Sequence, residues 1–216
     1  MNKEQKEIIK FINQNKDYYP EYLNEKIQKK ISYGYTCDIN QIYCHLKLKE
    51  INNTDYYEFY KVIKNNFNLN NIKILDVACG IIPILSSIIK ENEKSTITAI
   101  NNKMLFKNYK GIITKEFDLT KDYDVNNYDL IIGFRPCEVT EKIIQEAMQN
   151  KKDFCLYMCP CVMKPINNHH KGRWSQKRWY NYLEKVITDD KSYDLKVIID
   201  DKLDDDCPIF IANYKR

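Results

Sequence analysis

IKILDVACGIIPILSS, residues 72–87, is the most informative stretch of this chain. A short apolar strand ends at Asp76, a tight turn passes through Gly80, and a helix begins near Pro83, where the missing N–H of proline is harmless. A doubly wound α/β domain forms a ligand site in this way, at the carboxyl end of its first strand. An ordinary strand, turn and helix without a ligand is the alternative interpretation.

Strands and helices alternate from this stretch to the C-terminus. Predicted strands cover residues 73–77, 96–100, 111–115, 128–133, 153–158, 194–199 and 207–214, and predicted helices cover 83–91, 140–150 and 174–189, with a short helix or turn at 103–109. Helical crossovers imply a mostly parallel sheet. The last two strands have too few residues between them for a helix, so they must be antiparallel neighbours. We predict an α/β fold with a doubly wound, seven-stranded, mostly parallel sheet and an antiparallel last strand.

Residues 1–68 are predicted to form a helical N-terminal cap. Apolar residues follow helical spacing through 7–12 and 22–31, and Thr54 is placed to cap a further helix over 54–67. Residues 32–38, with Gly34 among tyrosines, are typical of a loop. We therefore expect a cap over 1–68 and a Rossmann-like domain over 69–216.

Length and composition favour a globular protein with one main domain. The chain has 216 residues, ordinary apolar content and a net charge of +4. No run approaches the roughly 20 apolar residues of a membrane helix. The first residues lack the apolar core of a secretion signal, so we expect a cytoplasmic location. Several of the eight cysteines lie in predicted apolar strands, which favours reduced thiols.

Over roughly residues 72–216 the chain resembles the class I S-adenosylmethionine (SAM)-dependent methyltransferases, whose first motif is an acidic residue, a Gly-rich turn and a helix. Asp76 and Gly80 match that motif, while Ala78 and Ile82 stand where the family usually has glycine. The resemblance implies SAM as cofactor, with Ala78, Cys79 and Gly80 beside its methionine end. Asp76 would orient the turn or, through water, the ligand's ammonium group.

The same resemblance assigns further cofactor contacts. Asn101 and Asn102 follow the second strand, where the family has an acid that accepts the ribose hydroxyls; an amide accepts more weakly, and Asn101 could instead be a turn residue. Asp118 and Leu119 match the third motif, in which an acid accepts the adenine amino group. Phe134, at the end of the fourth strand, completes the predicted cofactor site.

Residues 131–141, IIGFRPCEVTE, place an Arg, a Cys and a Glu on a non-helical turn at the rim where the family transfers methyl groups. Glu138 could be a base, Arg135 could hold a carboxylate or phosphate, and Cys137 could line the pocket. Alternatively, Thr140 or Glu138 caps the next helix and Arg135 pairs with an acid. The stretch loosely resembles one in a group of tRNA 2′-O-methyltransferases, which identifies no substrate.

Cys155, Cys159 and Cys161 suggest a metal or thiol site, with His169 and His170 downstream. The Cys-Pro-Cys spacing is unlike that of ordinary zinc knuckles, and Cys155 lies within a predicted strand. A reactive thiol or a pocket wall is therefore favoured over a metal, and no metal site is predicted. Further ligands would be Cys37, Cys44 and His45, if the cap folds over the rim. Either downstream histidine could be a general base near neutral pH.

The predicted catalytic residues are Arg135, Cys137, Glu138 and His169, and the acceptor is predicted to be RNA or a small metabolite. Residues 151–185 combine an excess of Lys and Arg with Trp174, Trp179 and Tyr180, as an RNA-binding surface would. The alternative is an amphipathic helix with a solvated basic face and buried tryptophans. A noncatalytic binding protein on the same fold, or a metal or thiol enzyme using residues 155–161, are the competing functions.

Overall fold

The structure is a computed structural model that describes residues 3–15, 37–161, 165, 174–203 and 206–216. The predicted helical segment 22–31, most of the predicted loop 32–38, and both His169 and His170 lie outside these ranges. Cys37 and Asp38, expected in that loop, begin a helix instead.

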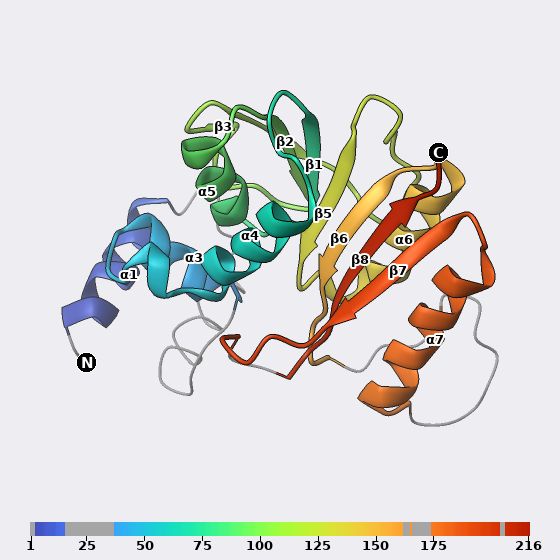
Figure 1. The fold of residues 1–216 in the computed structure, drawn as a ribbon. Helices are drawn as coiled ribbons and strands as arrows, with labels where there is room; N and C mark the ends of the chain where they lie inside the picture. Colours follow the sequence, from blue (N-terminus) through green and yellow to red (C-terminus); the bar gives the residue numbers. More distant parts are fainter. Residues whose placement is uncertain (1–2, 16–36, 162–164, 166–173, 204–205) are drawn as a thin grey trace.

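One sheet crosses the molecule in the strand order β3-β4-β2-β1-β5-β6-β8-β7 (Figure 1). The neighbouring strands β4, β2, β1, β5 and β6 are parallel, and β8 is antiparallel to both of its neighbours. This confirms the predicted α/β class, the parallel centre and the antiparallel pairing of the last two strands. The strands are β1 Lys73–Val77, β2 Thr96–Asn101, β3 Asn108–Tyr109, β4 Ile112–Glu116, β5 Leu130–Phe134, β6 Asp153–Tyr157, β7 Tyr193–Ile198 and β8 Ile209–Tyr214.

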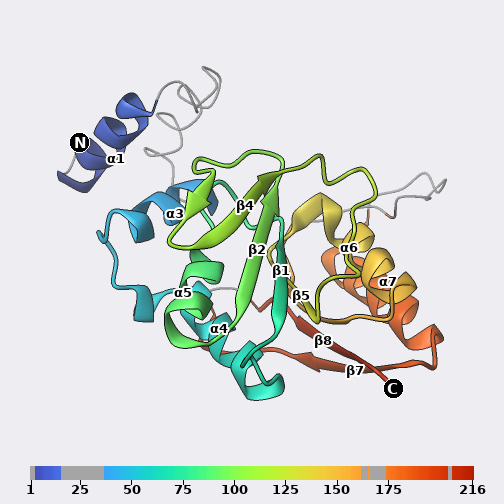
Figure 2. The ribbon, with the colours of Figure 1, turned by 90° about the horizontal axis from the view of Figure 1, so that it is seen from above.

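Helices form a layer on each side of the sheet (Figure 2). One side carries α3 Cys37–His45, α4 Asp55–Asn66 and α5 Ile84–Asn92, with α1 Lys3–Gln14 packed on α3. The other side carries α6 Thr140–Gln149 and α7 Gln176–Asp189. None of the helices in the described ranges is long and apolar enough to cross a membrane.

The local sequence explains where the main elements form. In β1, β5 and β6 four of the five residues are buried, as expected for parallel strands covered on both faces. Helix α4 begins after Thr54, whose hydroxyl accepts the N–H of Tyr57 at 3.3 Å, so the predicted N-cap is confirmed. Pro83 lies one residue before α5, not within its first turn.

The sheet has one strand more than predicted because residues 108–109 pair with β4 instead of forming the helix or turn expected at 103–109. Lys110 and Gly111 join the two strands with φ values of 51° and 78°. A two-residue hairpin loop with both residues left-handed matches the twist of the strands that it connects. β3 is therefore a short hairpin arm that protects the edge of β4.

Candidate functional site

The carboxyl ends of β1, β2, β4, β5 and β6 lie along one edge of the sheet, because these strands are parallel. Each predicted cofactor residue lies at or just after the carboxyl end of β1, β2, β4 or β5. The turn after β1 has two left-handed residues, Ala78 at φ 58° and Gly80 at φ 78°. The left-handed conformation costs a residue with a Cβ roughly 1–2 kcal/mol, so glycine would be less strained than Ala78 at this position.

Gln41 from α3 fills the space over this turn. Its Nε2 donates to the carbonyl of Cys79 at 2.9 Å, and its Oε1 accepts the N–H of Ile82 at 3.1 Å. The side chain is buried, and a Cβ on Gly80 would lie 2.0 Å from its Nε2. In this conformation the glycine therefore makes room for the protein's own amide. This contact could not be predicted from the sequence, because Gln41 lies far from the turn in the chain.

Ile82 does not obstruct the edge, because its side chain is fully buried in the core. Cys79 is also buried, and its thiol lies 3.6 Å from the sulfur of Met104. The bulk at Ile82 is therefore taken up by core packing.

Asp76 is buried at the end of β1 with one oxygen satisfied. Its Oδ2 accepts the hydroxyl of Ser86 at 2.6 Å, whereas its Oδ1 has no hydrogen-bond partner among the residues that the structure describes. Burial raises the pKa of this carboxyl to about 7, against the opposing effect of the Ser86 hydrogen bond. A buried carboxylate without a counter-charge is costly, so this position suits a cationic group nearby.

The ends of β2 and β4 are joined by the predicted residues themselves. Asn102 Oδ1 accepts the N–H of buried Leu119 at 3.0 Å, and Asn101 Nδ2 donates to the carbonyl of Lys103 at 3.0 Å. Asp118 is half exposed and accepts the backbone N–H and hydroxyl of Thr120 at 3.1 and 2.6 Å. These Thr120 hydrogen bonds lower the pKa of Asp118. All of these groups lie at one edge, but each already has a local partner.

Arg135 and Phe134 connect β5 to helix α4. The Arg135 guanidinium donates to Asp55 Oδ2 at 2.9 Å and to the hydroxyl of Tyr157 at 3.2 Å. Both members of the ion pair are largely buried, with about 15% exposure of the side chains. The ring of Phe134 stacks on Tyr56, with centroids 4.2 Å apart. The acid expected to pair with Arg135 in the alternative interpretation is thus Asp55, which the sequence did not single out.

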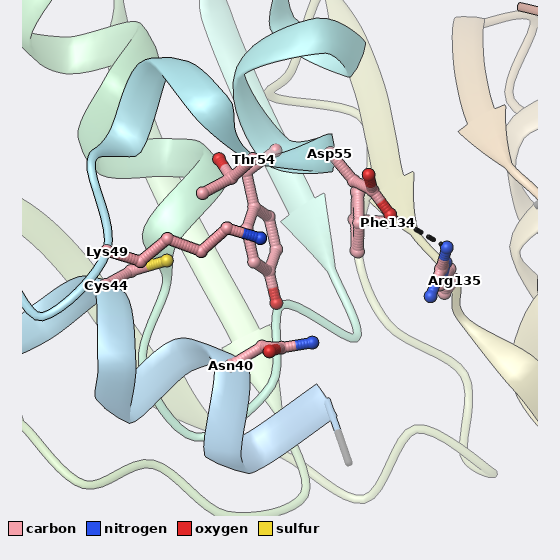
Figure 3. Close-up of a pocket in the computed structure, with 8 residues that line it drawn as sticks. Asn40, Cys44, Lys49, Thr54, Asp55, Phe134 and Arg135 are labelled. Carbon is pink, nitrogen blue, oxygen red and sulfur yellow. Dashed lines mark hydrogen bonds and ion pairs between the residues drawn. The ribbon is translucent and has the colours of Figure 1, made fainter. Parts of the chain in front are cut away.

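A small pocket lies beside this ion pair. Figure 3 shows Asn40 and Cys44 of α3 facing Asp55, Phe134 and Arg135 across it. Its volume is about 20 Å³, room for one water molecule. With the side chains in these positions, the pocket is too small to hold a metabolite. A larger hollow of about 220 Å³ lies against β1, β2 and the loop after β4, lined by Leu75, Ile100, Lys115, Phe117, Tyr123, Asp124, Asn127 and Tyr128.

The predicted cysteine cluster is rearranged. Cys155 is fully buried in β6, while Cys137 joins Cys159 and Cys161, with the three sulfurs within 4.8 Å of one another. The hydrogen bond from the Cys137 thiol, 3.2 Å between sulfurs, lowers the pKa of Cys159 to about 6, and the contacts of Cys161 and the charge of Arg135 act in the same direction. Cys137 was predicted to line the pocket and to be among the catalytic residues, and its place in this cluster was not predicted.

Other predicted residues are not brought into that cluster. Glu138 is exposed on the short helix η3, Cys137–Val139. His45 contacts the hydroxyl of Tyr109 through Nδ1 at 3.0 Å within an aromatic group, and Cys44 lines the small pocket. His169 lies outside the described residues, so its catalytic role stays a prediction.

The aromatic side chains of α7 are packed inward. Trp179 is buried and stacks on Tyr182, and Tyr180 donates its hydroxyl to the carbonyl of Cys159 at 2.8 Å. Arg178 lies over the ring of Trp174, 4.4 Å from its centroid. Helix α7 thus matches the amphipathic alternative, with a basic outer face, a buried Trp179, and Tyr180 and Tyr182 half-buried against the core.

No protein-family model and no curated protein matches this sequence. Solved structures do match its fold. A suspected SAM-dependent methyltransferase from Methanococcus maripaludis has a TM-score of 0.53 and 15% identity, over 79% of this chain and 91% of its own. The methyltransferase domain of bacterial CtHen1 has a TM-score of 0.50 and 16% identity, over 77% of this chain and all of its own. The small RNA methyltransferase HEN1 has a TM-score of 0.50 and 9% identity, over 76% of this chain and 25% of its own. The protein has the fold of the class I SAM-dependent methyltransferases.

Proposed function

We propose that the protein is a SAM-dependent methyltransferase that binds its methyl donor at the carboxyl edge of β1, β2 and β4. The observation that carries the proposal is the turn after β1. Within this fold it combines two left-handed residues, Ala78 and Gly80, with a buried Asp76 whose Oδ1 lacks a partner in the described part of the chain. A left-handed turn that a ligand can approach closely once the Gln41 amide moves away, and a carboxylate oxygen with no partner among the described residues, suit a ligand that carries an ammonium group.

The donor set at this edge fits SAM in kind. Asn101 and Asn102 supply amide groups at the end of β2, and Asp118 supplies a carboxylate at the end of β4. Hydroxyls and an amino group are what such acceptors bind. Gln41 occupies the space over Gly80, so donor binding requires its amide to leave the turn. The described conformation is then the closed form of the site.

In the transfer itself, the bound donor would supply a methyl group on a sulfonium. The protein positions the acceptor and excludes water. Phe134 and Tyr56 form an apolar wall, and the Arg135–Asp55 pair holds β5 against α4 at that wall. Glu138, exposed at the rim, and His169 are the proposed bases for an acceptor that must lose a proton. A small metabolite is the favoured acceptor, because the α7 aromatics are packed inward.

The test is calorimetric titration with SAM and with S-adenosylhomocysteine. The wild-type protein is expected to bind both, and Asp118→Ala to bind both more weakly. Asp124→Ala is the matched control, since Asp124 accepts the N–H of Asn126 at 2.8 Å in the same kind of turn on the same loop. Gln41→Ala should bind roughly ten- to a hundredfold more tightly, because two hydrogen bonds no longer compete with the ligand.

Binding that is equal in Asp118→Ala and Asp124→Ala would contradict the placement of the donor. Binding by neither the wild-type protein nor Gln41→Ala would contradict the proposal itself. A donor carrying a labelled methyl group, incubated with cell RNA and with a small-molecule extract separately, then distinguishes the two acceptor classes.

A second candidate function is a noncatalytic binding protein on the methyltransferase fold. The observation that favours it is Gln41, which satisfies the turn after β1 from within the chain. This candidate predicts that removal of the Gln41 amide creates no affinity for either ligand. The same titration therefore separates the two functions.

A further inference from the structure

The loops that follow β5 and β6 bring three cysteines together at the rim. The two strands are parallel neighbours, with Phe134 in register with Tyr157. Cys137 follows β5 by three residues and Cys159 follows β6 by two, so both arrive at the same edge. Their sulfurs are 3.2 Å apart, and the sulfur of Cys161 lies within 4.8 Å of both.

These separations fit one tetrahedral ion. Zinc–sulfur bonds of about 2.3 Å at tetrahedral angles place neighbouring sulfurs about 3.8 Å apart. The Cys137–Cys159 distance of 3.2 Å is somewhat shorter than this value and the other two distances are at most 4.8 Å, so small side-chain movements would complete the geometry. Thiolates are ligands that select soft or borderline ions such as Zn²⁺ over Mg²⁺ or Ca²⁺.

Hydrogen bonds already fix the loops that carry these sulfurs. The N–H of Cys161 points to the sulfur of Cys159 at 3.4 Å, and Tyr180 donates to the carbonyl of Cys159 at 2.8 Å. The hydroxyl of Thr140 donates to the carbonyl of Cys137 at 2.7 Å. Metal sites depend on such secondary contacts to orient their ligands.

Backbone strain is concentrated in the same loop. Arg135 and Cys137, on either side of Pro136, are both left-handed, with φ values of 51° and 50°. Non-glycine residues keep this conformation only where surrounding contacts impose it, and such residues gather at functional sites. Here the conformation accompanies the placement of the Cys137 sulfur beside Cys159.

We propose that Cys137, Cys159 and Cys161 bind one zinc ion through three thiolates. Zn²⁺ displaces to solvent whatever protons the three thiols still carry, and no electron transfer is involved. The fourth position would be taken by water or by an added ligand, as in zinc sites that are not structurally closed. Cys161 is exposed, which gives the ion a path of entry. This zinc site does not depend on SAM binding.

The test is zinc analysis of protein purified under reducing conditions, loaded with zinc and dialysed. One zinc per chain is expected in the wild-type protein and in Cys155→Ala, a control within β6, the strand that precedes Cys159. Cys137→Ser, Cys159→Ser and Cys161→Ser should each lower the zinc affinity at least tenfold. Cobalt substitution should give thiolate-to-cobalt charge-transfer absorption in the wild-type protein and in the control, and weaker absorption in the serine variants.

Thermal unfolding with chelator present shows whether each serine variant remains folded, since all should then unfold like the metal-free wild-type protein. No zinc in the reduced wild-type protein, or unchanged zinc in the three serine variants, would overturn the proposal. So would iron with sulfide in place of zinc. A Cys137–Cys159 disulfide in metal-free protein that reduction and zinc do not convert would overturn it in favour of a redox pair.

Discussion

A methyl group added at Gly80 would lie 2.0 Å from Nε2 of Gln41 and 2.5 Å from its Oε1. The amide is the far end of a flexible side chain, so it can move aside, but only by giving up its hydrogen bonds to Cys79 and Ile82. The φ of 78° adds strain for any residue with a Cβ. The two effects can be separated by mutation.

Gly80→Ala is expected to destabilise the wild-type protein through both effects and the Gln41→Ala protein through backbone strain alone. The coupling free energy between the two substitutions should be about 1–3 kcal/mol, the value of two hydrogen bonds. Denaturant unfolding of the four proteins measures it. Additive losses would show that Gln41 is not in contact with the turn in solution.

Asp76 gives the fold a dependence on pH whose sign follows from its environment. Burial raises the pKa of this carboxyl from 3.8 to about 7 in the folded protein. Between these values the folded state binds more protons than the unfolded state, so the free energy of unfolding falls as pH rises from about 4 to about 7. The loss is on the order of a few kcal/mol.

Asp76→Asn should remove most of this slope. The variant should be less stable than the wild-type protein near pH 4 and should gain relative to it near pH 8, as measured by urea unfolding across this range. Asp201→Asn, at an exposed position, is the control and should leave the wild-type slope intact. A parallel pH profile for Asp76→Asn and the wild-type protein would refute the raised pKa.

The Arg135–Asp55 ion pair connects two elements, the end of β5 and the start of α4. Because both side chains are largely buried, removal of one partner leaves a charge without its counterpart. Arg135→Met or Asp55→Asn should each cost about 3 kcal/mol, and the double variant less than the sum. The exposed Lys185–Asp189 pair of α7 is the comparison, where Asp189→Asn should cost less than about 1 kcal/mol. Equal small costs at both pairs would contradict the role assigned to Arg135.

Elements that depend on local pattern could be predicted from the sequence, and their contacts could not. The strands β1, β5 and β6 are buried apolar runs, and Thr54 is a typical helix cap, so both were found within one or two residues. The β3 hairpin was missed because its turn, Lys110-Gly111, interrupts only a very short apolar run. The Gln41 contact was missed because it depends on how α3 packs, which no local pattern records.

Part of the candidate site could likewise be predicted from the sequence, and part could not. The edge formed by Asp76, Gly80, Asn102 and Asp118 could be predicted, because it follows from strand order along the chain. The pairing of Cys137 with Cys159 could not, since it depends on the register of β5 with β6 and on a left-handed backbone at Cys137.

For the whole molecule, zinc should raise stability, because its ligands lie on loops that leave two central strands. At a free zinc concentration a hundredfold above the dissociation constant, the gain should be about 2.7 kcal/mol. A chelator should therefore lower the unfolding midpoint of the wild-type protein and of Cys155→Ala, while Cys159→Ser should not respond. A chelator effect of equal size in Cys159→Ser would place the metal elsewhere.

Helix α3 should also respond to ligand in an unusual direction. Ligands ordinarily slow amide hydrogen exchange in the segments that they touch. A donor bound over Gly80 would displace Gln41 and so release the two bonds that tie α3 to the turn after β1. Amide hydrogens of α3 would then exchange faster in the complex than in the free protein, while those of β1 exchange more slowly. Helix α3 would then be least protected when the site is occupied.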